Sequence, residues 1–426
     1  MRVLALLLFL TLLAAPAAAQ PSATCDGYPR ADIGMAKGYC AGLVVGPPRQ
    51  MRLPRSLVQL PGGDWIVSDL GGWGTARGAI WRLSAAPGRP ARLTRLLGGL
   101  NLPHALGIGP DGRLYVGEMS RIFRFDPEAA DPAASIEPVV TGLPDNRLHE
   151  NRHPLSKFVF APDGALIVNI GAPSDQCLDA RGRRPGDDCP DLKEAGQLRR
   201  YAPDGQGGWS PDWTVVATGL RNSLALAAHP SGALLQGENS YDSPARWAPL
   251  DEINVIRGTG KEGVPSYGWP YCDAAGQASP GWAGSGKIAF HCQRTGVFKA
   301  AILLPPHSAP LDMTWYDGAM FPALRGRLLM TWHGYRSTGG RLVAFETDSQ
   351  GVPTTKGGAR FPIYGGAPRA YGPGPAAEPL VLTPGWGAAR GRRQGAPVGV
   401  AVAADGAIWL TDDKAGQVLR IAPDRP

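Results

Sequence analysis

The hydrophobic and polar positions of the chain follow a recurring unit of three short apolar segments. In its clearest copy, residues 102–109 and 113–118 flank the tripeptide Pro110-Asp111-Gly112, and a third apolar segment follows at 121–125. Proline sets φ at the first turn position, and glycine tolerates the positive φ needed near the end of the turn. Each unit therefore predicts two strands joined by a tight turn, followed by a third strand.

Six copies of this unit occur along the chain. They begin at Leu53, Leu102, His153, Leu220, Pro310 and Pro397, and the fifth copy is degenerate. No 3.6-residue helical pattern separates them, which indicates an all-β repeat protein. Repeats of about 50 residues or more fit the blades of a propeller. The sequence thus predicts a six-bladed β-propeller over residues 51–426; the alternative is a β-solenoid, whose rungs are much shorter.

The first residues have the pattern of a targeting segment. Arg2 precedes an apolar run at 3–13, and the small residues at 14–19 supply a cleavage site. This pattern predicts a signal peptide at 1–19, followed by an N-terminal extension at 20–50. No later segment has the roughly 18 uncharged apolar residues that a membrane span needs. We therefore expect a periplasmic or secreted protein.

Six cysteines in an exported chain favour disulfides over a metal site. Six thiols allow about fifteen pairings, and the local spacings favour Cys25–Cys40, Cys177–Cys189 and Cys272–Cys292. Each bond would contribute about 3 kcal/mol by restricting the unfolded chain.

The net charge of +7 comes from scattered basic residues. The densest clusters lie at 181–184 and 390–393, and neither is interleaved with aromatic residues as a nucleic-acid groove would be. Nucleic-acid binding is therefore not expected. Attraction of an anionic cofactor or surface fits the charge better.

The candidate reactive groups stand at the starts of repeats. His153 and His104 each precede an innermost strand, where side chains face the axial channel, and a neutral imidazole there can take a hydroxyl proton. A hydrogen-bonded structural histidine is the alternative for either. Arg221-Asn222 begins the fourth repeat, where an arginine could bind a carboxylate or stabilise an oxyanion; a solvated pair is the alternative. The sequence lacks a Gly-x-Ser-x-Gly elbow and a phosphate-binding glycine loop.

Several blocks of residues resemble one known family. They are Leu220-Arg221-Asn222 with Gly237-Glu238-Asn239, Asp251-Glu252-Ile253-Asn254 with Tyr267-Gly268-Trp269-Pro270, His153-Pro154-Leu155-Ser156-Lys157, His333-Gly334 with Arg336, and the final repeat. Together they are similar to the soluble pyrroloquinoline quinone (PQQ)-dependent glucose and sorbosone dehydrogenases, over most of residues 50–425. The resemblance implies a six-bladed propeller with PQQ on its axis and calcium beside it. It also implies that an aldose or related sugar is oxidised by hydride transfer, with an external electron acceptor.

The resemblance assigns roles residue by residue. His153 matches the catalytic base, and Arg221 matches the arginine beside the quinone carbonyls. Asn222 and Arg336 match cofactor contacts, and Arg336 would meet a PQQ carboxylate. The backbone carbonyls of Ser240 and Tyr241 fall where the family holds its calcium.

Two departures from the family pattern concern cofactor contacts. Ser223-Leu224-Ala225 stands where the family often has Pro-Gln-Gly, and Ala396 and Val398 stand where its final blade tends to carry arginine. Arg392 or Arg393 could substitute from the preceding loop. Two other functions stay open. One is a non-catalytic propeller that binds a glycan or a protein, and the other is a calcium-dependent lactonase, which would need several inward-facing carboxylates.

Overall fold

The protein folds into six four-stranded antiparallel sheets arranged around one axis. The computed structural model describes residues 24–144, 151–245, 247–257, 263–284, 288, 292, 297 and 299–425, except 335, 337, 356–359, 364–365, 371–376, 385 and 387–394. The predicted signal peptide at 1–19 lies outside the described residues, as do Arg392 and Arg393.

The strands follow the predicted repeats. Blade 1 contains β4 (Pro54–Gln59), β5 (Trp65–Asp69), β6 (Gly78–Ser84) and β7 (Arg92–Leu100); blade 2 contains β8 (Ala105–Ile108), β9 (Leu114–Glu118), β10 (Arg121–Phe125) and β11 (Glu137–Val140). Blade 3 contains β12 (Phe158–Phe160), β13 (Leu166–Ile170), β14 (Gln197–Pro203) and β15 (Trp209–Thr218); blade 4 contains β16 (Ala225–Ala228), β17 (Leu234–Glu238), β18 (Leu250–Ile256) and β19 (Ile302–Pro306). Blade 5 contains β20 (Pro310–Trp315), β21 (Leu328–Trp332), β22 (Arg341–Phe345) and β25 (Leu380–Val381); blade 6 contains β26 (Pro397–Val402), β27 (Ile408–Asp412), β28 (Gln417–Pro423) and β3 (Tyr39–Val45).

The remaining elements are short. Two hairpins lie outside the blades, β1 (Thr24–Cys25) with β2 (Tyr28–Pro29) and β23 (Arg360–Ile363) with β24 (Gly366–Ala370). The described 3₁₀ turns are η1 (Ala133–Ser135), η2 (Pro190–Lys193), η3 (Pro280–Trp282) and η4 (Pro322–Leu324).

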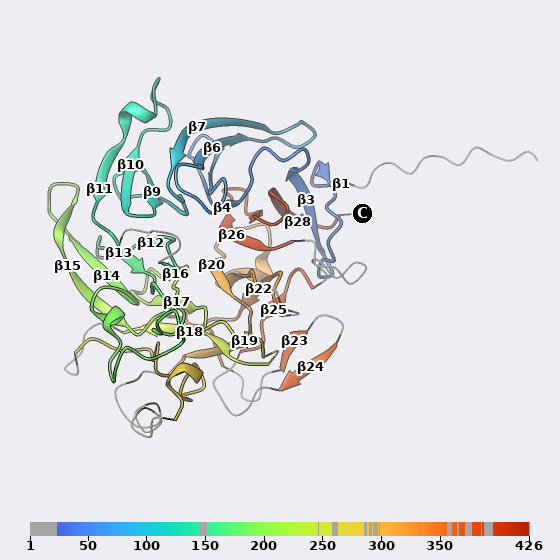
Figure 1. Ribbon diagram of the computed structural model, residues 1–426. Helices are drawn as coiled ribbons and strands as arrows, with labels where there is room; N and C mark the ends of the chain where they lie inside the picture. Colours follow the sequence, from blue (N-terminus) through green and yellow to red (C-terminus); the bar gives the residue numbers. More distant parts are fainter. Residues whose placement is uncertain are drawn as a thin grey trace, which may run out of the picture.

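The prediction of an all-β, six-bladed propeller is confirmed. The first strand of each repeat lies toward the middle of the ring, and the later strands lie outward (Figure 1). The ring closes between the two ends of the chain, because β3 pairs with β28 in the register Leu43↔Leu419. The predicted N-terminal extension at 20–50 thus contributes a strand to the last blade. Closure of this kind leaves few free strand edges.

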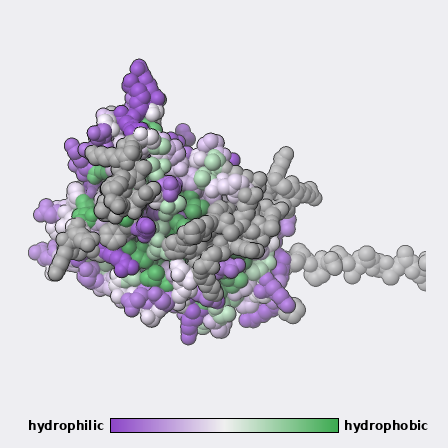
Figure 2. Space-filling model, turned by 90° about the horizontal axis from the view of Figure 1, so that it is seen from below, coloured by the Kyte–Doolittle hydropathy of each residue, from purple (hydrophilic) through white to green (hydrophobic). Residues whose placement is uncertain are grey.

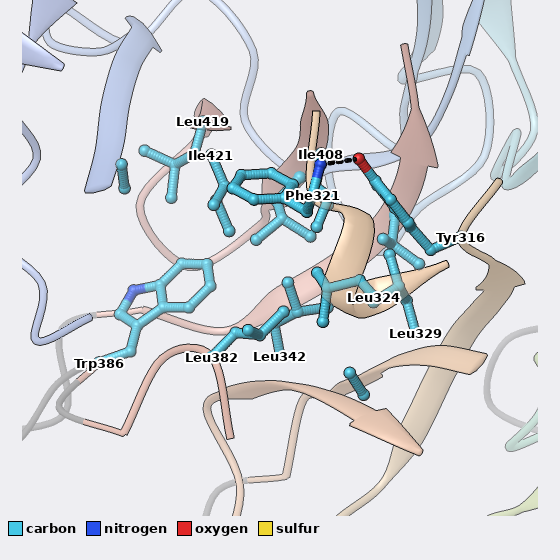
Figure 3. Close-up of a cluster of buried hydrophobic side chains, with 14 residues drawn as sticks. Tyr316, Phe321, Leu324, Leu329, Leu342, Leu382, Trp386, Ile408, Leu419 and Ile421 are labelled. Atoms are coloured by element: carbon cyan, nitrogen blue, oxygen red, sulfur yellow. Dashed lines mark hydrogen bonds between the residues drawn. The ribbon is translucent and has the colours of Figure 1, made fainter. Parts of the chain in front are cut away.

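The blades are held together by apolar side chains on both faces of each sheet. Every residue of β5, β9, β13, β21 and β27, the second strands of their blades, is buried. Figure 3 shows the cluster between blades 5 and 6, in which Leu329 and Leu342 face Ile408 and Leu419. Tyr316 keeps its polar atom satisfied there, because its hydroxyl accepts a hydrogen bond from the Phe321 amide at 2.9 Å.

A separate apolar cluster combines residues from all six blades. It consists of Leu70, Leu102, Met119, Leu155, Leu224, Leu311 and Val398, which come from all six blades. Because each blade contributes a residue near its inner strand, this cluster lies around the axis. It forms an apolar floor beneath the loops of one rim.

All three predicted disulfides are present, Cys25–Cys40, Cys177–Cys189 and Cys272–Cys292. The last two lie in long loops of blades 3 and 4. Their cysteines pack with Ala172, Trp269, Trp282 and Ile288 in a small core of their own. We call residues 171–196 with 267–284 the cap.

The face shown in Figure 2 is mainly polar where the described residues form it. Seen from below, the side chains that project are hydrophilic, and hydrophobic ones lie in the recesses between them (Figure 2). Among the described residues, we find no helix of the length and apolarity needed to cross a bilayer.

Candidate active site

One cavity of about 630 Å³ collects all the predicted site residues. His153, Arg221, Asn222, Ser240, Tyr241 and Arg336 all line it. Its floor includes Leu155, Leu224 and Leu311, which also belong to the axial apolar cluster. The volume and the mixture of an apolar floor with converging polar groups are typical of a small-molecule site.

His153 precedes β12 and is held in one orientation. Its Nδ1 lies 2.6 Å from the carbonyl oxygen of Ala172, and its backbone N–H donates to Asn151 Oδ1 at 2.9 Å. A carbonyl can only accept, so Nδ1 carries the proton and Nε2 has a lone pair. Nε2 has no hydrogen-bond partner among the described residues. Burial, and secondarily the Arg221 charge, hold the pKa of His153 well below its ordinary value, so the ring is neutral near pH 7.

Arg221 is buried and bound on every side of its guanidinium. Its Nε donates to Asp175 Oδ1 at 2.8 Å, and Nη2 lies 2.6 Å from the same oxygen. Nη1 donates to the Asn239 carbonyl at 3.2 Å, and Nη2 donates to Asp242 Oδ1 at 3.1 Å. The backbone N–H groups of Arg221 and Asn222 both donate to Glu238 Oε1, at 2.8 and 2.9 Å. A fixed cation therefore lies on the cavity wall with its planar face and edges in set positions.

The side chains of Asn222 and Asn239 complete this part of the wall. The amide of Asn222 has no hydrogen-bond partner among the described residues. Asn239 Oδ1 is buried and likewise lacks one within the described chain. Polar atoms left in this state next to a cavity fit contact with a bound polar molecule.

Ser240 and Tyr241 lie where the cavity adjoins a second space of about 20 Å³. Glu238, Glu252 and Asp273 line that smaller space. Burial raises the pKa of Glu238 to about 7 and that of Glu252 to about 8, and it also raises the pKa of Asp273. Carbonyls and carboxylates are the ligands that calcium prefers, so the donor chemistry fits this ion.

The described acids do not converge on one point. The one group of three potential ligands within 4.8 Å among the described residues is Cys177, Cys189 and Asp191, and its sulfurs form a disulfide. A calcium ion beside Ser240 and Tyr241 would therefore take at most two ligands from these acids, Glu252 among them, and its other ligands from carbonyls and from oxygens of the bound molecule or water.

Sequence reasoning missed an ion pair on the opposite side of the cavity. Arg55 Nη1 and Asp413 Oδ2 lie 2.5 Å apart, and His333 Nε2 lies 2.9 Å from Asp413 Oδ1. The His333 and Arg55 contacts outweigh burial and hold the pKa of Asp413 below its ordinary value. The repeat could have identified Arg55 as a candidate, because Leu53-Pro54-Arg55 aligns with Leu102-Pro103-His104. His104 itself accepts a hydrogen bond from Arg55 Nε at 3.2 Å and does not line the cavity.

Arg55 lies beside the inner strand in which the family pattern leads us to expect arginine. Val398 is buried in the axial apolar cluster, and Ala396 is fully buried as well. A Cβ on Gly399 would lie 2.3 Å from the Arg55 carbonyl oxygen, so the two inner strands approach closely there. Blade 1 therefore brings a cation to the part of the cavity next to blade 6.

The mouth of the cavity carries one further unpredicted residue, Trp73. Its side chain is 58% exposed, the highest value among the exposed large hydrophobic side chains of the described chain. It stands in the loop between β5 and β6, beside Gly71 and Gly72, whose φ values are +63° and +138°. A Cβ on Gly71 would lie 1.9 Å from the Arg77 carbonyl oxygen, so only glycine permits this tight loop.

Comparison with known proteins gives a family match and distant relatives. The model of the family described as TrAA12-like matches residues 33–361. A pyrroloquinoline quinone-dependent pyranose dehydrogenase of Coprinopsis cinerea is 25% identical over 340 residues, which are 71% of this chain and 44% of that protein. The chain thus spans less than half the length of this curated relative.

Solved structures share the fold at low identity. A Trichoderma reesei protein of carbohydrate-active enzyme family AA12, in a calcium structure, has a TM-score of 0.68 at 20% identity, covering 93% of this chain and 98% of that one. The holo form of the pyranose dehydrogenase PQQ domain from Coprinopsis cinerea has a TM-score of 0.64 at 18% identity, covering 94% and 99%.

Proposed function

The chain belongs to the TrAA12-like family, and we propose that it is an exported PQQ-dependent oxidoreductase that acts on a pyranose sugar. The pyranose dehydrogenase activity named for the Coprinopsis cinerea relative supports this assignment. Three disulfides support a location outside the cytoplasm.

The observation that carries the proposal is the pairing of His153 with Arg221 on one cavity wall. His153 offers a neutral imidazole whose Nε2 has no partner in the described chain, and Arg221 offers a fixed cation. A base and a cation on the same wall suit a reaction that removes a proton while negative charge develops nearby.

Each residue of the site has its own role in the proposed reaction. Bound PQQ supplies the acceptor for the hydride that leaves the hydroxyl-bearing carbon of the sugar. His153 Nε2 accepts the proton of that hydroxyl, and the Ala172 carbonyl stabilises the resulting imidazolium through Nδ1–H. Arg221 stabilises negative charge at the cavity wall, where burial keeps the effective dielectric low.

The wall also fits the charge of the cofactor. PQQ is a tricarboxylate, and the lining of the cavity carries four arginines, Arg55, Arg152, Arg221 and Arg336, against three carboxylates, those of Asp242, Asp251 and Asp413. Asn222 offers a side-chain amide, and the carbonyls of Ser240 and Tyr241 offer oxygens to calcium. Arg55 would replace the arginine of the family's final blade, where this chain has Ala396 and Val398.

Trp73 defines the substrate side of the cavity. An exposed indole beside charged and amide groups is suited to a pyranose, whose C–H face is apolar and whose hydroxyls need polar partners. We therefore assign the sugar ring to the space beneath Trp73.

Reconstitution tests the proposal directly. The purified protein would be mixed with PQQ and calcium, and an absorbance titration would measure cofactor binding. A panel of pyranoses with a dye acceptor would then measure turnover. Saturable binding with dye reduction is expected. Binding without turnover on any sugar would favour a non-catalytic propeller, and absence of both would refute the proposal.

A further inference from the structure

We propose that Asp175 is the positioning residue of Arg221 and that the disulfide-linked cap holds Asp175 in place. This inference rests on the proposed function only for the task given to Arg221. The geometry of the pair itself is independent of that task.

Asp175 makes the principal contact with the Arg221 guanidinium. A single oxygen, Oδ1, accepts a hydrogen bond from Nε at 2.8 Å and lies 2.6 Å from Nη2 as an ion pair. The side chains are only 6% and 16% exposed, so solvent screens the pair weakly. Asp242 also meets Nη2, at 3.1 Å, but its side chain is 65% exposed and is shared with Arg152. Asp175 is therefore the stronger of the two carboxylate anchors.

Contacts within the cap hold the segment from Asp175 to Cys177. The Trp269 indole donates to the Asp175 carbonyl at 2.8 Å, and the Trp282 indole donates to the next carbonyl, that of Gln176, at 2.9 Å. Cys177 follows with a φ of +54°, its N–H bound to Ser174 Oγ at 2.9 Å and its sulfur bound to Cys189. A non-glycine residue with positive φ persists where its surroundings determine the backbone.

The same carboxylate joins two other parts of the site. Asp175 Oδ1 accepts the Asp242 backbone N–H at 2.9 Å, which ties the loop after β17 to the cap. It also balances the Arg221 charge, which is one of the causes that lower the pKa of His153. Loss of this carboxylate should therefore disturb the position of the guanidinium. It should also lower the pKa of His153 further, because the Arg221 charge would no longer be balanced.

The first test measures position without using the cofactor. The Nε–H of Arg221 gives an NMR signal, assigned by its absence in Arg221→Lys, and its exchange with water reports the hydrogen bond to Asp175. We expect Asp175→Asn and the double variant Cys177→Ser/Cys189→Ser to speed this exchange about tenfold or more. The matched control is Cys25→Ser/Cys40→Ser, which removes a disulfide of similar loop length at the ring closure. Unchanged exchange in Asp175→Asn, or equal changes in both double variants, would overturn the proposal.

The second test measures function by a double-mutant cycle. Asp175→Asn should lower kcat about 10- to 100-fold with a smaller effect on KM, and Asp175→Glu should restore part of it. In an Arg221→Lys background the same substitution should have little effect, because Asp175 acts through Arg221. Additive losses would contradict the positioning role. If the unaltered protein neither binds nor uses PQQ, the proposed function fails while the NMR test still decides this inference.

Discussion

His153 and Arg221 are connected through the backbone of a single residue, Ala172. The carbonyl of Ala172 lies 2.6 Å from His153 Nδ1, and its N–H donates to the Arg221 carbonyl at 2.8 Å. The third and fourth repeats are thereby held at a fixed offset, with the base and the cation facing one cavity. A shift of either repeat would move both groups, so the geometry of the pair is a property of the fold.

Replacement of His153 should separate chemistry from binding. We expect His153→Gln to lower kcat by about 10²–10⁴-fold, since glutamine cannot take the hydroxyl proton. Cofactor affinity should change little, because the charged groups of the cavity remain. Steady-state kinetics and a PQQ absorbance titration would check this. His229→Gln is the matched control, because His229 lies in a surface turn and not at the cavity; an equal loss in both variants would contradict the assignment.

The pH profile should reflect the lowered pKa of His153. Burial, then the charges of Arg221 and Arg152, favour the neutral ring, so kcat/KM should stay flat as pH falls through the ordinary value of 6.5. Arg152→Gln removes one of these charges and should move the acid limb to higher pH, whereas Arg113→Gln on blade 2 should not. A limb at 6.5 in the unaltered protein would refute the prediction.

The free energy of unfolding should fall at acidic pH because of His153. Because its pKa is lower in the folded state, the unfolded chain binds the proton more readily as pH falls below 6.5. The contribution of this residue is thus fully present above that pH and is lost on acidification. Denaturant unfolding of the unaltered protein and of His153→Gln, at pH 7.5 and 5, would show a smaller acid loss in the variant. Equal losses would argue against a depressed pKa.

Trp73 should govern substrate affinity rather than chemistry. We expect Trp73→Ala to raise KM about three- to tenfold, the equivalent of roughly 0.5–1.5 kcal/mol of aromatic contact, with kcat nearly unchanged. Trp73→Phe should recover most of the loss. Trp213→Ala is the control, because Trp213 is exposed but covered by Arg199 on an outer strand. A change in kcat alone would place Trp73 outside the substrate site.

Calcium should stabilise the protein through the carboxylates beside Tyr241. Glu252 is buried and has no cation partner among the described residues, so a bound divalent ion would offset the cost of its charge. At 100-fold excess over Kd, we expect about 2.7 kcal/mol of added stability, measured as a higher Tm. Glu252→Gln should reduce this gain, and the exposed Glu128→Gln should leave it intact. No shift with calcium, measured both with and without PQQ, would exclude an ion at this position.

The repeat pattern was sufficient to predict most of the fold. Turns such as Pro110-Asp111-Gly112 are local, and alternating apolar positions determine which residues a sheet buries, so strands and blade number follow from short stretches of sequence. Cysteine spacing likewise predicted the three disulfides. Pairing of β3 with β28 was not predicted, because it joins residues at opposite ends of the chain and no local pattern encodes that contact.

The candidate site, like the fold, was predictable from the sequence only in part. The sequence by itself determined which residue types begin the repeats. It therefore predicted that His153, Arg221 and Asn222 lie at one rim of the propeller. Only the tertiary structure decided the partners of these residues, because those partners lie on other blades and loops. Asp175 reaches Arg221 from 46 positions away, and Arg55 meets Asp413 across 358. The first contact joins the neighbouring blades 3 and 4, and the second joins blades 1 and 6 where the ring closes. These contacts supply the charges and burial that set the chemistry of the cavity.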